Sequence, residues 1–522
     1  MSMKLSIKNT ESYLCVIISA ILCGISRFDL PLDFMIFFAI IPIFRYFQLT
    51  TTEYKSRSLK NNIFRSFIHA SIYSTIFLLI SVHWISLVTI PGFIGILFLY
   101  AFYYTVFFTI LNYGISRNPA HLPQFIILGF ISLELILSYG PFKFPWLNLG
   151  YSLTHSRYLI QALEIGGVYL LSTLILVVNY LLFSIITGLK NKENSIKRLS
   201  LCLVILISSW WGFGYCRYHH LNTVKKKAKA GIVQVSIPQE MKWNPAFIDS
   251  TLTMYEQKSK ELVKENAVDL VIWPEAAVPL YLMQWQESLN RMLFFTHSTG
   301  VNIFTGFPHF VEGVKYPQQP EPYLFYNSAS QFKPYMQYDS LYSKNQLVPF
   351  GERIPFLEYF PILWKLQFGQ ANFERGGQYR YYQVKDALYS PLICYEVLFP
   401  DYVRKMMDKP VDFIVNITND AWFKKSVGTY QHKMITVFRA VESRRPVFRS
   451  ANTGYSVIIN PRGDIEKELI LYEKGTISAQ IESCELKSVY HRIGFILPFL
   501  GLFLFFIEFI LTIFTKNGKC AL

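Results

Sequence analysis

Eight apolar segments constrain the fold of this chain more than any other feature of its sequence. We predict that each is a membrane-spanning helix, because about 20 mostly apolar residues are enough to cross a bilayer core. The segments cover residues 13–25, 32–47, 66–88, 93–115, 125–139, 165–189, 199–215 and 493–514. With 52% hydrophobic and only 16% charged residues, the composition excludes an ordinary soluble protein.

The basic residues indicate how such a chain is oriented in a membrane. The chain has 50 Lys and Arg residues against 35 Asp and Glu residues, a formal net charge of +15. Basic residues gather in cytoplasmic loops of membrane proteins, so we attribute the charge to the membrane and not to nucleic acid. If every segment crosses, the pattern predicts that both termini are cytoplasmic and the region 216–492 lies outside the cytoplasm. The basic cluster at 217, 225–227 and 229 departs from this pattern.

The region between the last two apolar segments has a different sequence pattern. Short β-rich runs such as "AGIVQVSI", "VDLVIWPE" and "VDFIVNITND" alternate with helical stretches such as "YQHKMITVFRAVESR". This alternation predicts an α/β domain whose sheets are covered by helices. We therefore expect a helical membrane bundle over 1–215, a catalytic domain over 216–492, and a last membrane helix with a short cytoplasmic tail over 493–522.

Three segments of this domain offer residues for nucleophilic catalysis. Glu275 follows "VIWP", Lys344 and Glu352 lie in "YSKNQLVPFGE", and Cys394 ends "SPLIC". A nucleophilic cysteine needs a nearby base or cation, because an unperturbed thiol has a pKa of about 8.5. Glu275 is the candidate base. Lys344 is the candidate cation that keeps the Glu275 carboxylate ionised and stabilises an oxyanion.

Other interpretations of these residues stay open. Cys394 is equally typical of a buried core thiol, and His432 is an alternative base, although the local signatures of papain-like and caspase-like cysteines are absent. The seven cysteines include no CxxC pair, which argues against a disulfide framework. We expect no metal or cofactor, because no His/Cys/Asp cluster has ligand spacing.

The ordered motifs "WPEAAVP", "SKNQLVPFGE", "LICYEVLFP", "NITNDAWF" and "SANTGYSVIINPRG" resemble those of the nitrilase, or carbon-nitrogen hydrolase, superfamily. Together with the helical bundle, "VQVSIPQEMKW" and "FPWLNLGYS", they resemble the apolipoprotein N-acyltransferase family. The resemblance implies a four-layer αββα sandwich inserted in a membrane domain of about eight helices. It implies a catalytic triad of Glu275, Lys344 and Cys394. The residues to which it gives supporting or substrate-binding roles are Glu352, Tyr395, Glu396, Trp243 and Trp146.

The resemblance also implies a ping-pong reaction in a bacterial inner membrane. Cys394 would take an acyl chain from the sn-1 position of a phospholipid, typically phosphatidylethanolamine, as a thioester. The α-amine of the N-terminal S-diacylglyceryl-cysteine of an apolipoprotein would then receive the chain as an amide, the final step of lipoprotein maturation. The implied partners are these two substrates and the membrane, with no nucleic acid, and the enzyme is expected to be a monomer.

Two other functions stay open, and some residues depart from the family pattern. The alternatives are a membrane-tethered nitrilase-type amidase that hydrolyses its thioester, and a transporter or receptor in which Cys394 is a core thiol. Ser343 stands where an acidic residue is frequent. A membrane carboxylate is costly unless it is paired, and the sequence identifies no partner for Glu134 or Glu508, with Leu137 at the place of a family arginine near Glu134.

Overall fold

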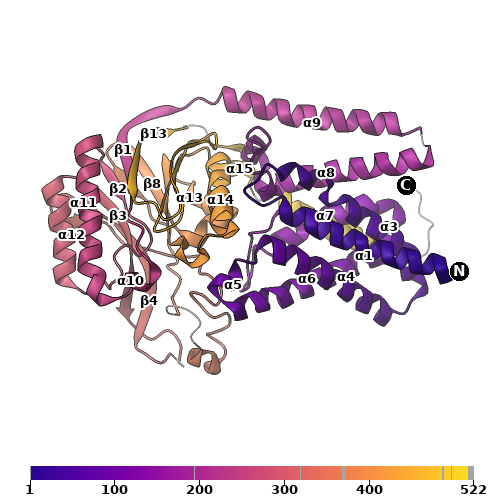
Figure 1. The fold of residues 1–522 in the computed structure, drawn as a ribbon, viewed down its shortest axis with the longest axis horizontal. Helices are drawn as coiled ribbons and strands as arrows, with labels where there is room; N and C mark the ends of the chain where they lie inside the picture. Colours follow the sequence, from indigo (N-terminus) through magenta and orange to yellow (C-terminus); the bar gives the residue numbers. More distant parts are fainter. Residues whose placement is uncertain are drawn as a thin grey trace. The chain divides into compact units, whose positions relative to one another are not determined.

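The computed structural model describes residues 2–192, 194–317, 319–366, 372–484, 487–494 and 496–514, with side chains from Thr10 onward. The expected cytoplasmic tail at 515–522 lies outside these residues. The chain folds into two compact units (Figure 1). A helical unit contains Met1–Gly140, Phe144–His219 and Ile493–Leu522, and a sheet unit contains Pro141–Lys143 and His220–Arg492.

The helical unit contains eight long helices among its described residues. They are α1 (Ser2–Ile25), α3 (Ile41–Ser56), α4 (Leu59–Ser81), α6 (Ile90–Arg117), α7 (Leu122–Ile136), α8 (Leu163–Asn191), α9 (Ile196–His219) and α16 (Ile496–Phe514). Shorter pieces are α2 (Ile36–Ala39), α5 (Ile85–Val88), η1 (Asp33–Met35), η2 (Pro119–His121), η3 (Leu149–Ser152) and η4 (Leu159–Ala162). Within the described chain, seven helices are long and apolar enough to cross a membrane, and the apolar part of α1, Thr10–Ile25, is shorter.

Several helix limits differ from those expected from hydropathy, because polar first turns and caps carry no hydropathy signal. The α4 helix begins at Leu59 rather than at 66, and the Ser58 side chain caps it by accepting from the backbone N–H of Asn61 at 3.4 Å. The α9 helix continues to His219, beyond the expected limit at 215, so residues 216–219 belong to the helical unit.

The two intramembrane acids have partners that are distant in the sequence. Glu508 on α16 contacts Nδ1 of His121 in η2. Glu134 on α7 accepts hydrogen bonds through Oε1 from the Leu149 backbone N–H at 2.6 Å and from the Ser172 hydroxyl at 3.1 Å. Arg27, just beyond α1, is close enough to interact electrostatically with Glu134. Glu508 therefore has an ionisable partner, and Glu134 is hydrogen-bonded through one carboxylate oxygen, which reduces the cost of a carboxylate in a membrane.

The sheet unit contains two sheets. The seven-stranded sheet has the order β13-β1-β2-β3-β4-β5, with β6 also paired to β4, and the six-stranded sheet has the order β12-β11-β10-β9-β8-β7. The first consists of β1 (Val224–Gln234), β2 (Leu270–Ile272), β3 (Asn302–Glu312), β4 (Tyr323–Lys333), β5 (Gln337–Tyr338), β6 (Tyr342–Ser343) and β13 (Gly475–Ser483). The second consists of β7 (Tyr382–Val384), β8 (Ala387–Ile393), β9 (Phe413–Thr418), β10 (Val447–Ala451), β11 (Ser456–Ile459) and β12 (Ile465–Leu469).

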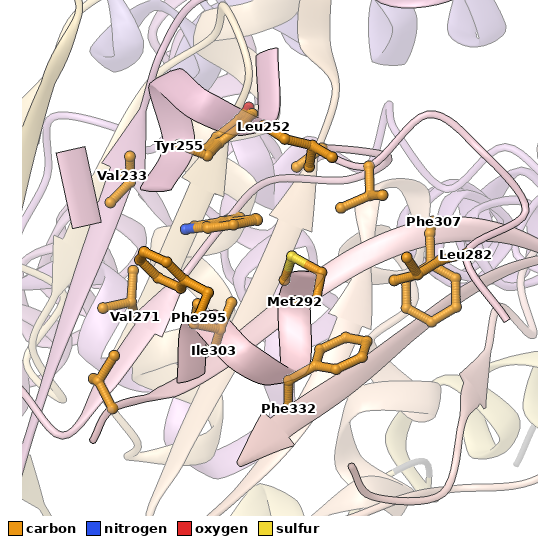
Figure 2. Packing of buried hydrophobic residues seen from close by; sticks show 14 of the residues in the cluster. Val233, Leu252, Tyr255, Val271, Leu282, Met292, Phe295, Ile303, Phe307 and Phe332 are labelled. Carbon is orange, nitrogen blue, oxygen red and sulfur yellow. The ribbon is translucent and has the colours of Figure 1, made fainter. Parts of the chain in front are cut away.

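Helices cover one face of each sheet, which gives four layers. On the seven-stranded sheet, α11 (Ile248–Asn266) and α12 (Gln286–Thr299) pack through a cluster that includes Val233, Leu252 and Met292 (Figure 2). On the six-stranded sheet lie α13 (Pro400–Met406) and α14 (Val427–Ser443). The remaining short helices are α10 (Gln239–Lys242), η5 (Pro245–Phe247), η6 (Pro361–Lys365), η7 (Cys394–Leu398), η8 (Asp420–Phe423) and α15 (Val489–Ile493).

A second hydrophobic core joins the two sheets face to face. Neighbouring residues of β1 show how both cores form, because side chains alternate between the faces of a strand. Val233 belongs to the core under α11 and α12, whereas Ile232 belongs to the core that also contains Tyr389 and Phe448 of the other sheet. The predicted αββα sandwich is therefore confirmed.

Candidate active site

The sandwich brings the three predicted reactive residues together at the ends of its strands. Glu275 follows β2, Lys344 follows β6, and Cys394 directly follows β8 as the first residue of η7. The Lys344 Nζ atom lies 3.6 Å from Oε1 of Glu275 and 2.8 Å from Oε1 of Glu352. The Cys394 thiol interacts electrostatically with Glu275 and Lys344. The three predicted residues and Glu352, which are distant in the sequence, therefore lie in one local cluster.

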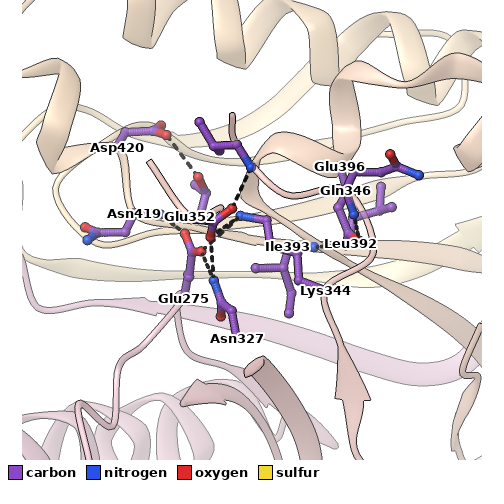
Figure 3. Close-up of polar contacts among 12 residues, drawn as sticks. Glu275, Asn327, Lys344, Gln346, Glu352, Leu392, Ile393, Glu396, Asn419 and Asp420 are labelled. Atoms are coloured by element: carbon purple, nitrogen blue, oxygen red, sulfur yellow. Dashed lines mark hydrogen bonds and ion pairs between the residues drawn. The ribbon is translucent and has the colours of Figure 1, made fainter. Parts of the chain in front are cut away.

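Two amide groups fix the orientation of the Glu275 carboxylate. Its Oε1 accepts from the Asn327 side-chain amide at 2.7 Å, and its Oε2 accepts from the Asn419 backbone N–H at 2.9 Å (Figure 3). Gly306 on β3 lets the backbone pass close behind this residue, since an added Cβ would lie 3.2 Å from the Glu275 Cα. The carboxylate is therefore buried, hydrogen-bonded on both oxygens and held in place.

Lys344 is a permanently charged group in this setting. Only 1% of its side chain is exposed, and burial alone would lower the pKa of the ammonium. The carboxylates of Glu352 and Glu275 outweigh that effect, so the pKa of Lys344 is raised above its usual value. The Val348 backbone N–H donates to the other oxygen of Glu352 at 2.9 Å, which holds this second carboxylate in place. Lys344 can therefore act as a fixed cation and cannot act as a base.

Cys394 has an unusual backbone and an unactivated resting thiol. Its φ of +50° lies in the left-handed region, which non-glycine residues rarely adopt and which often marks a functional position. Burial, followed by the Glu275 charge, raises the pKa of the thiol to about 12, against the opposing effect of Lys344. Because burial outweighs the effect of Lys344, the thiolate fraction of Cys394 is low at rest. The arrangement instead suits removal of the proton by Glu275 during attack.

Glu396 connects the nucleophile strand to the segment that carries Lys344. It is fully buried and accepts hydrogen bonds from the backbone N–H groups of Ile393 at 2.7 Å and Asn345 at 2.6 Å, and from the Tyr342 hydroxyl at 2.6 Å. Because Ile393 precedes Cys394 and Asn345 follows Lys344, one carboxylate fixes the spacing between these two segments. Its place in the structure suits a supporting role.

The segment Pro141–Lys143 is part of the sheet unit and contacts the residue after the nucleophile. The Tyr395 hydroxyl donates to the Lys143 backbone carbonyl at 2.7 Å. The Lys143 ammonium lies 4.9 Å from the centroid of the Phe399 ring and contacts the Gln346 side chain. Burial lowers the pKa of Lys143 to about 8. Tyr395 is thereby anchored at its hydroxyl.

The two tryptophans proposed from motifs lie in different units. Trp243 follows α10 in the sheet unit, and 36% of its surface is exposed. Trp146 lies in the helical unit, where it is buried, stacks on Phe144 at a centroid distance of 5.7 Å and packs against Trp84 at 4.9 Å.

His432, the alternative base considered from the sequence, belongs to a buried charged network whose other members, Asp420 and Arg449, the sequence analysis missed. Asp420 in η8 is 2.7 Å from Arg449 NH2 and 3.0 Å from Nδ1 of His432 on α14. The His432 ring also interacts with the backbone of Cys394, and burial followed by the Arg449 charge lowers the pKa of the ring. His432 thus contacts the Cys394 backbone, which does not favour it as the base for the thiol. The motifs "NDAWF" and "RSANTG" were the available signals for this network.

Lys242 was also missed, although it directly precedes Trp243. It is 3% exposed, and its Nζ donates to the Glu275 backbone carbonyl at 2.8 Å.

Within the described ranges, no group of three or more His, Cys, Asp or Glu side chains is arranged to hold a metal ion.

Comparisons with known proteins agree with both units. The model of the carbon-nitrogen hydrolase family matches residues 229–490, and the model of the apolipoprotein N-acyltransferase N-terminal domain matches residues 19–181. The chain also aligns with a solved amidase from Nesterenkonia sp. at a TM-score of 0.38 and 16% identity, over 52% of this chain and 95% of that chain.

Several relatives named apolipoprotein N-acyltransferase match most of the chain. The protein of Geobacter metallireducens is 32% identical over 407 residues, 77% of each chain. That of Rickettsia prowazekii is 33% identical over 70% of this chain and 71% of its own. That of Chlorobaculum tepidum is 26% identical over 90% of this chain and 91% of its own. With its apolar helices and its carbon-nitrogen hydrolase domain, the chain belongs to the apolipoprotein N-acyltransferase family of multi-pass membrane enzymes.

Proposed function

We propose that this protein moves an acyl chain from the sn-1 position of a membrane phospholipid to the α-amine of the S-diacylglyceryl-cysteine of an apolipoprotein, through a thioester on Cys394. The single observation that supports this most directly is the buried cluster of Glu275, Lys344 and Glu352 around that thiol. Family membership supports the choice of substrates, because the relatives share both the helical and the hydrolase-like parts.

In the first half-reaction, Sγ of Cys394 attacks the carbonyl carbon of the sn-1 ester while Glu275 takes the thiol proton. The tetrahedral intermediate has a negative oxygen, and the Lys344 ammonium is the candidate group that stabilises it, together with a backbone N–H near Tyr395. When the intermediate collapses, the carbon–oxygen bond breaks and the Glu275 proton goes to the departing glycerol oxygen. The products are a lysophospholipid and the Cys394 thioester.

In the second half-reaction, the α-amine of the apolipoprotein attacks the thioester carbonyl carbon. Glu275 takes the amine proton, Lys344 again stabilises the negative oxygen, and the carbon–sulfur bond breaks as the proton returns to Sγ. The product is the amide of a triacylated lipoprotein, and the free thiol is restored. The carboxylate and the ammonium thus serve in both halves without a net change.

The same proposal assigns a location to each part of the chain. Residues 1–219 and 493–522 form the membrane domain of a bacterial inner membrane protein, and residues 220–492 form an extracytoplasmic catalytic domain, with both termini of the chain in the cytoplasm. The distribution of basic residues between the apolar segments supports this orientation. Phosphatidylethanolamine is the proposed donor, and the enzyme is proposed to act as a monomer.

Intact mass spectrometry tests the function directly. The wild type and Cys394→Ala are incubated with phosphatidylethanolamine alone and then with a diacylated lipopeptide. A mass gain of one acyl chain that depends on Cys394 and disappears on adding the lipopeptide is the expected result. Free fatty acid without a transferred chain would favour the nitrilase-type amidase. Full transfer by Cys394→Ala would refute the thioester.

A further inference from the structure

Lys242 is a buried lysine that precedes Glu275 in the sequence. The proposed reaction does not yet use it. It ends α10, and 3% of its surface is exposed. Its Nζ donates to the backbone carbonyl of Glu275 at 2.8 Å and interacts electrostatically with the Glu275 carboxylate and the Cys394 thiol. A buried ammonium without a carboxylate in a salt bridge is costly, so this position calls for a functional explanation.

The charge balance of the site supplies that explanation. Glu275 and Glu352 are two carboxylates that share the single ammonium of Lys344, at 3.6 Å and 2.8 Å. With only these three groups the buried cluster has a net negative charge. During attack by Cys394, Glu275 becomes neutral as it takes the thiol proton, and the negative charge passes to the substrate oxygen. A net negative site opposes the formation of that negative oxygen. With Lys242, the two carboxylates of Glu275 and Glu352 are matched by two ammonium groups, while Asp420 is paired separately with Arg449.

We propose that Lys242 is the second cation of the active site, which offsets the surplus carboxylate charge and holds the Glu275 backbone so that its carboxylate faces Cys394. The inference rests on the proposed function, because it assigns Lys242 a role in forming the Cys394 thioester. Lys242 acts through Glu275 and through its charge, so it is a positioning residue and makes no covalent bond.

The ionisation of Lys242 gives this role a measurable signature. Burial lowers the pKa of Lys242 to about 8, and the charges of Glu275 and Cys394 act in the opposite direction. Below that pH the side chain is an ammonium, and above it the side chain loses its proton and the site loses one positive charge. Thioester formation should therefore slow above about pH 8, because Lys242 loses its positive charge there.

The test is the rate of thioester formation from phosphatidylethanolamine, followed by intact mass from about pH 6 to about pH 10. The variants are Lys242→Met, which removes the charge, and Lys242→Arg, whose guanidinium stays protonated over this range. The matched control is Lys258→Met, because Lys258 is a surface lysine on α11 that pairs with Glu261 at 2.7 Å.

We expect Lys242→Met to form the thioester about tenfold to about 1,000-fold more slowly at neutral pH, without the alkaline decline. Lys242→Arg should recover part of the rate and keep it above about pH 8, whereas Lys258→Met should behave as the wild type. Thermal unfolding of each purified variant checks that it is folded. If Lys242→Met cannot be purified in a folded state, the rate of thioester formation by Lys242→Arg at alkaline pH decides whether the role of Lys242 holds.

Failure of this inference is distinct from failure of the proposed function. If the wild type forms a thioester and Lys242→Met forms it at the same rate with the same alkaline decline, Lys242 is not the second cation. An alkaline decline that persists in Lys242→Arg would lead to the same conclusion. If the wild type forms no thioester at all, the proposed function fails before Lys242 is tested.

Discussion

The Nζ atom of Lys344 lies 2.8 Å from Oε1 of Glu352, in a place where only 1% of the lysine side chain is exposed. The distance from Lys344 Nζ to Oε1 of Glu275 is longer, at 3.6 Å. Glu352 therefore takes up most of the lysine charge. Glu275 remains available to exchange a proton with the thiol.

Glu352→Gln should slow thioester formation by about tenfold to about 100-fold, because Lys344 would then move toward Glu275 and make it a weaker base. The measurement is the rate of the acyl adduct by intact mass. Glu358→Gln is the matched control, since Glu358 is a more exposed acid that pairs with Arg353 at 3.6 Å. Equal rates in both variants would mean that the ion pair has no catalytic role.

Glu275→Gln should slow thioester formation more strongly, by about 100-fold to about 10,000-fold, because an amide cannot take the thiol proton. The amide would also turn an NH₂ group toward the Asn327 side chain or the Asn419 backbone, which are both donors. Glu261→Gln, on the exposed face of α11, is the control. A Glu275→Gln enzyme with wild-type rates would exclude this residue as the base.

The resting Cys394 thiol should react slowly with iodoacetamide at neutral pH and faster as the pH rises toward 10. Its pKa is raised to about 12 by burial and by Glu275, so the thiol form predominates at every pH below that value. Peptide mass spectrometry after timed labelling follows Cys394 separately from the exposed Cys202 and Cys216. Rapid labelling of Cys394 at pH 7 would contradict the raised pKa of this thiol.

The contact between His432 and the Cys394 backbone should be separable from its contact with Asp420. His432→Gln places an amide nitrogen near the position of Nε2 and keeps a donor for Cys394, whereas His432→Asn places one near Nδ1 and keeps the contact with Asp420. We expect His432→Asn to lose about tenfold more activity than His432→Gln at similar thermal stability. Equal losses would indicate that the ring only fills space.

Arg27→Met should destabilise the helical unit by about 3 to about 5 kcal/mol, because it removes a buried charge from its partners. The guanidinium donates to the Leu147 and Asn148 carbonyls at 2.8 and 3.1 Å and interacts with Glu134. Arg45→Met is the control, since its pair with Glu11 is more than one third exposed and should cost less than about 1 kcal/mol. Thermal unfolding in detergent compares the two, and similar shifts would contradict the network.

The sequence predicts best those features that local periodicity encodes. Glu275 and Cys394 follow strongly apolar runs, and such runs mark strand ends where side chains from separate segments meet. The apolar segments locate the membrane helices for the same reason. Their limits are less accurate, because caps such as Ser58 depend on one side chain and not on a pattern.

Features that depend on three-dimensional proximity could not be predicted in this way. The partners of Glu134 come from residues 27, 149 and 172, and the ring of His432 contacts a backbone at residue 394. Lys242 is a single lysine in a polar stretch, where a solvated side chain is the ordinary outcome. The raised pKa of the thiol depends on burial, which no neighbour in the sequence specifies.

The pairing of β1 with β13 brings together the two ends of His220–Arg492, the main segment of the sheet unit. Val224 at the start of β1 is paired with Ser483 at the end of β13. A domain whose two ends are neighbours can be inserted into a loop of another protein without separating the flanking elements. This segment therefore has the geometry of a domain inserted between α9 and α16. Replacing it with a short linker should leave the helical unit able to fold.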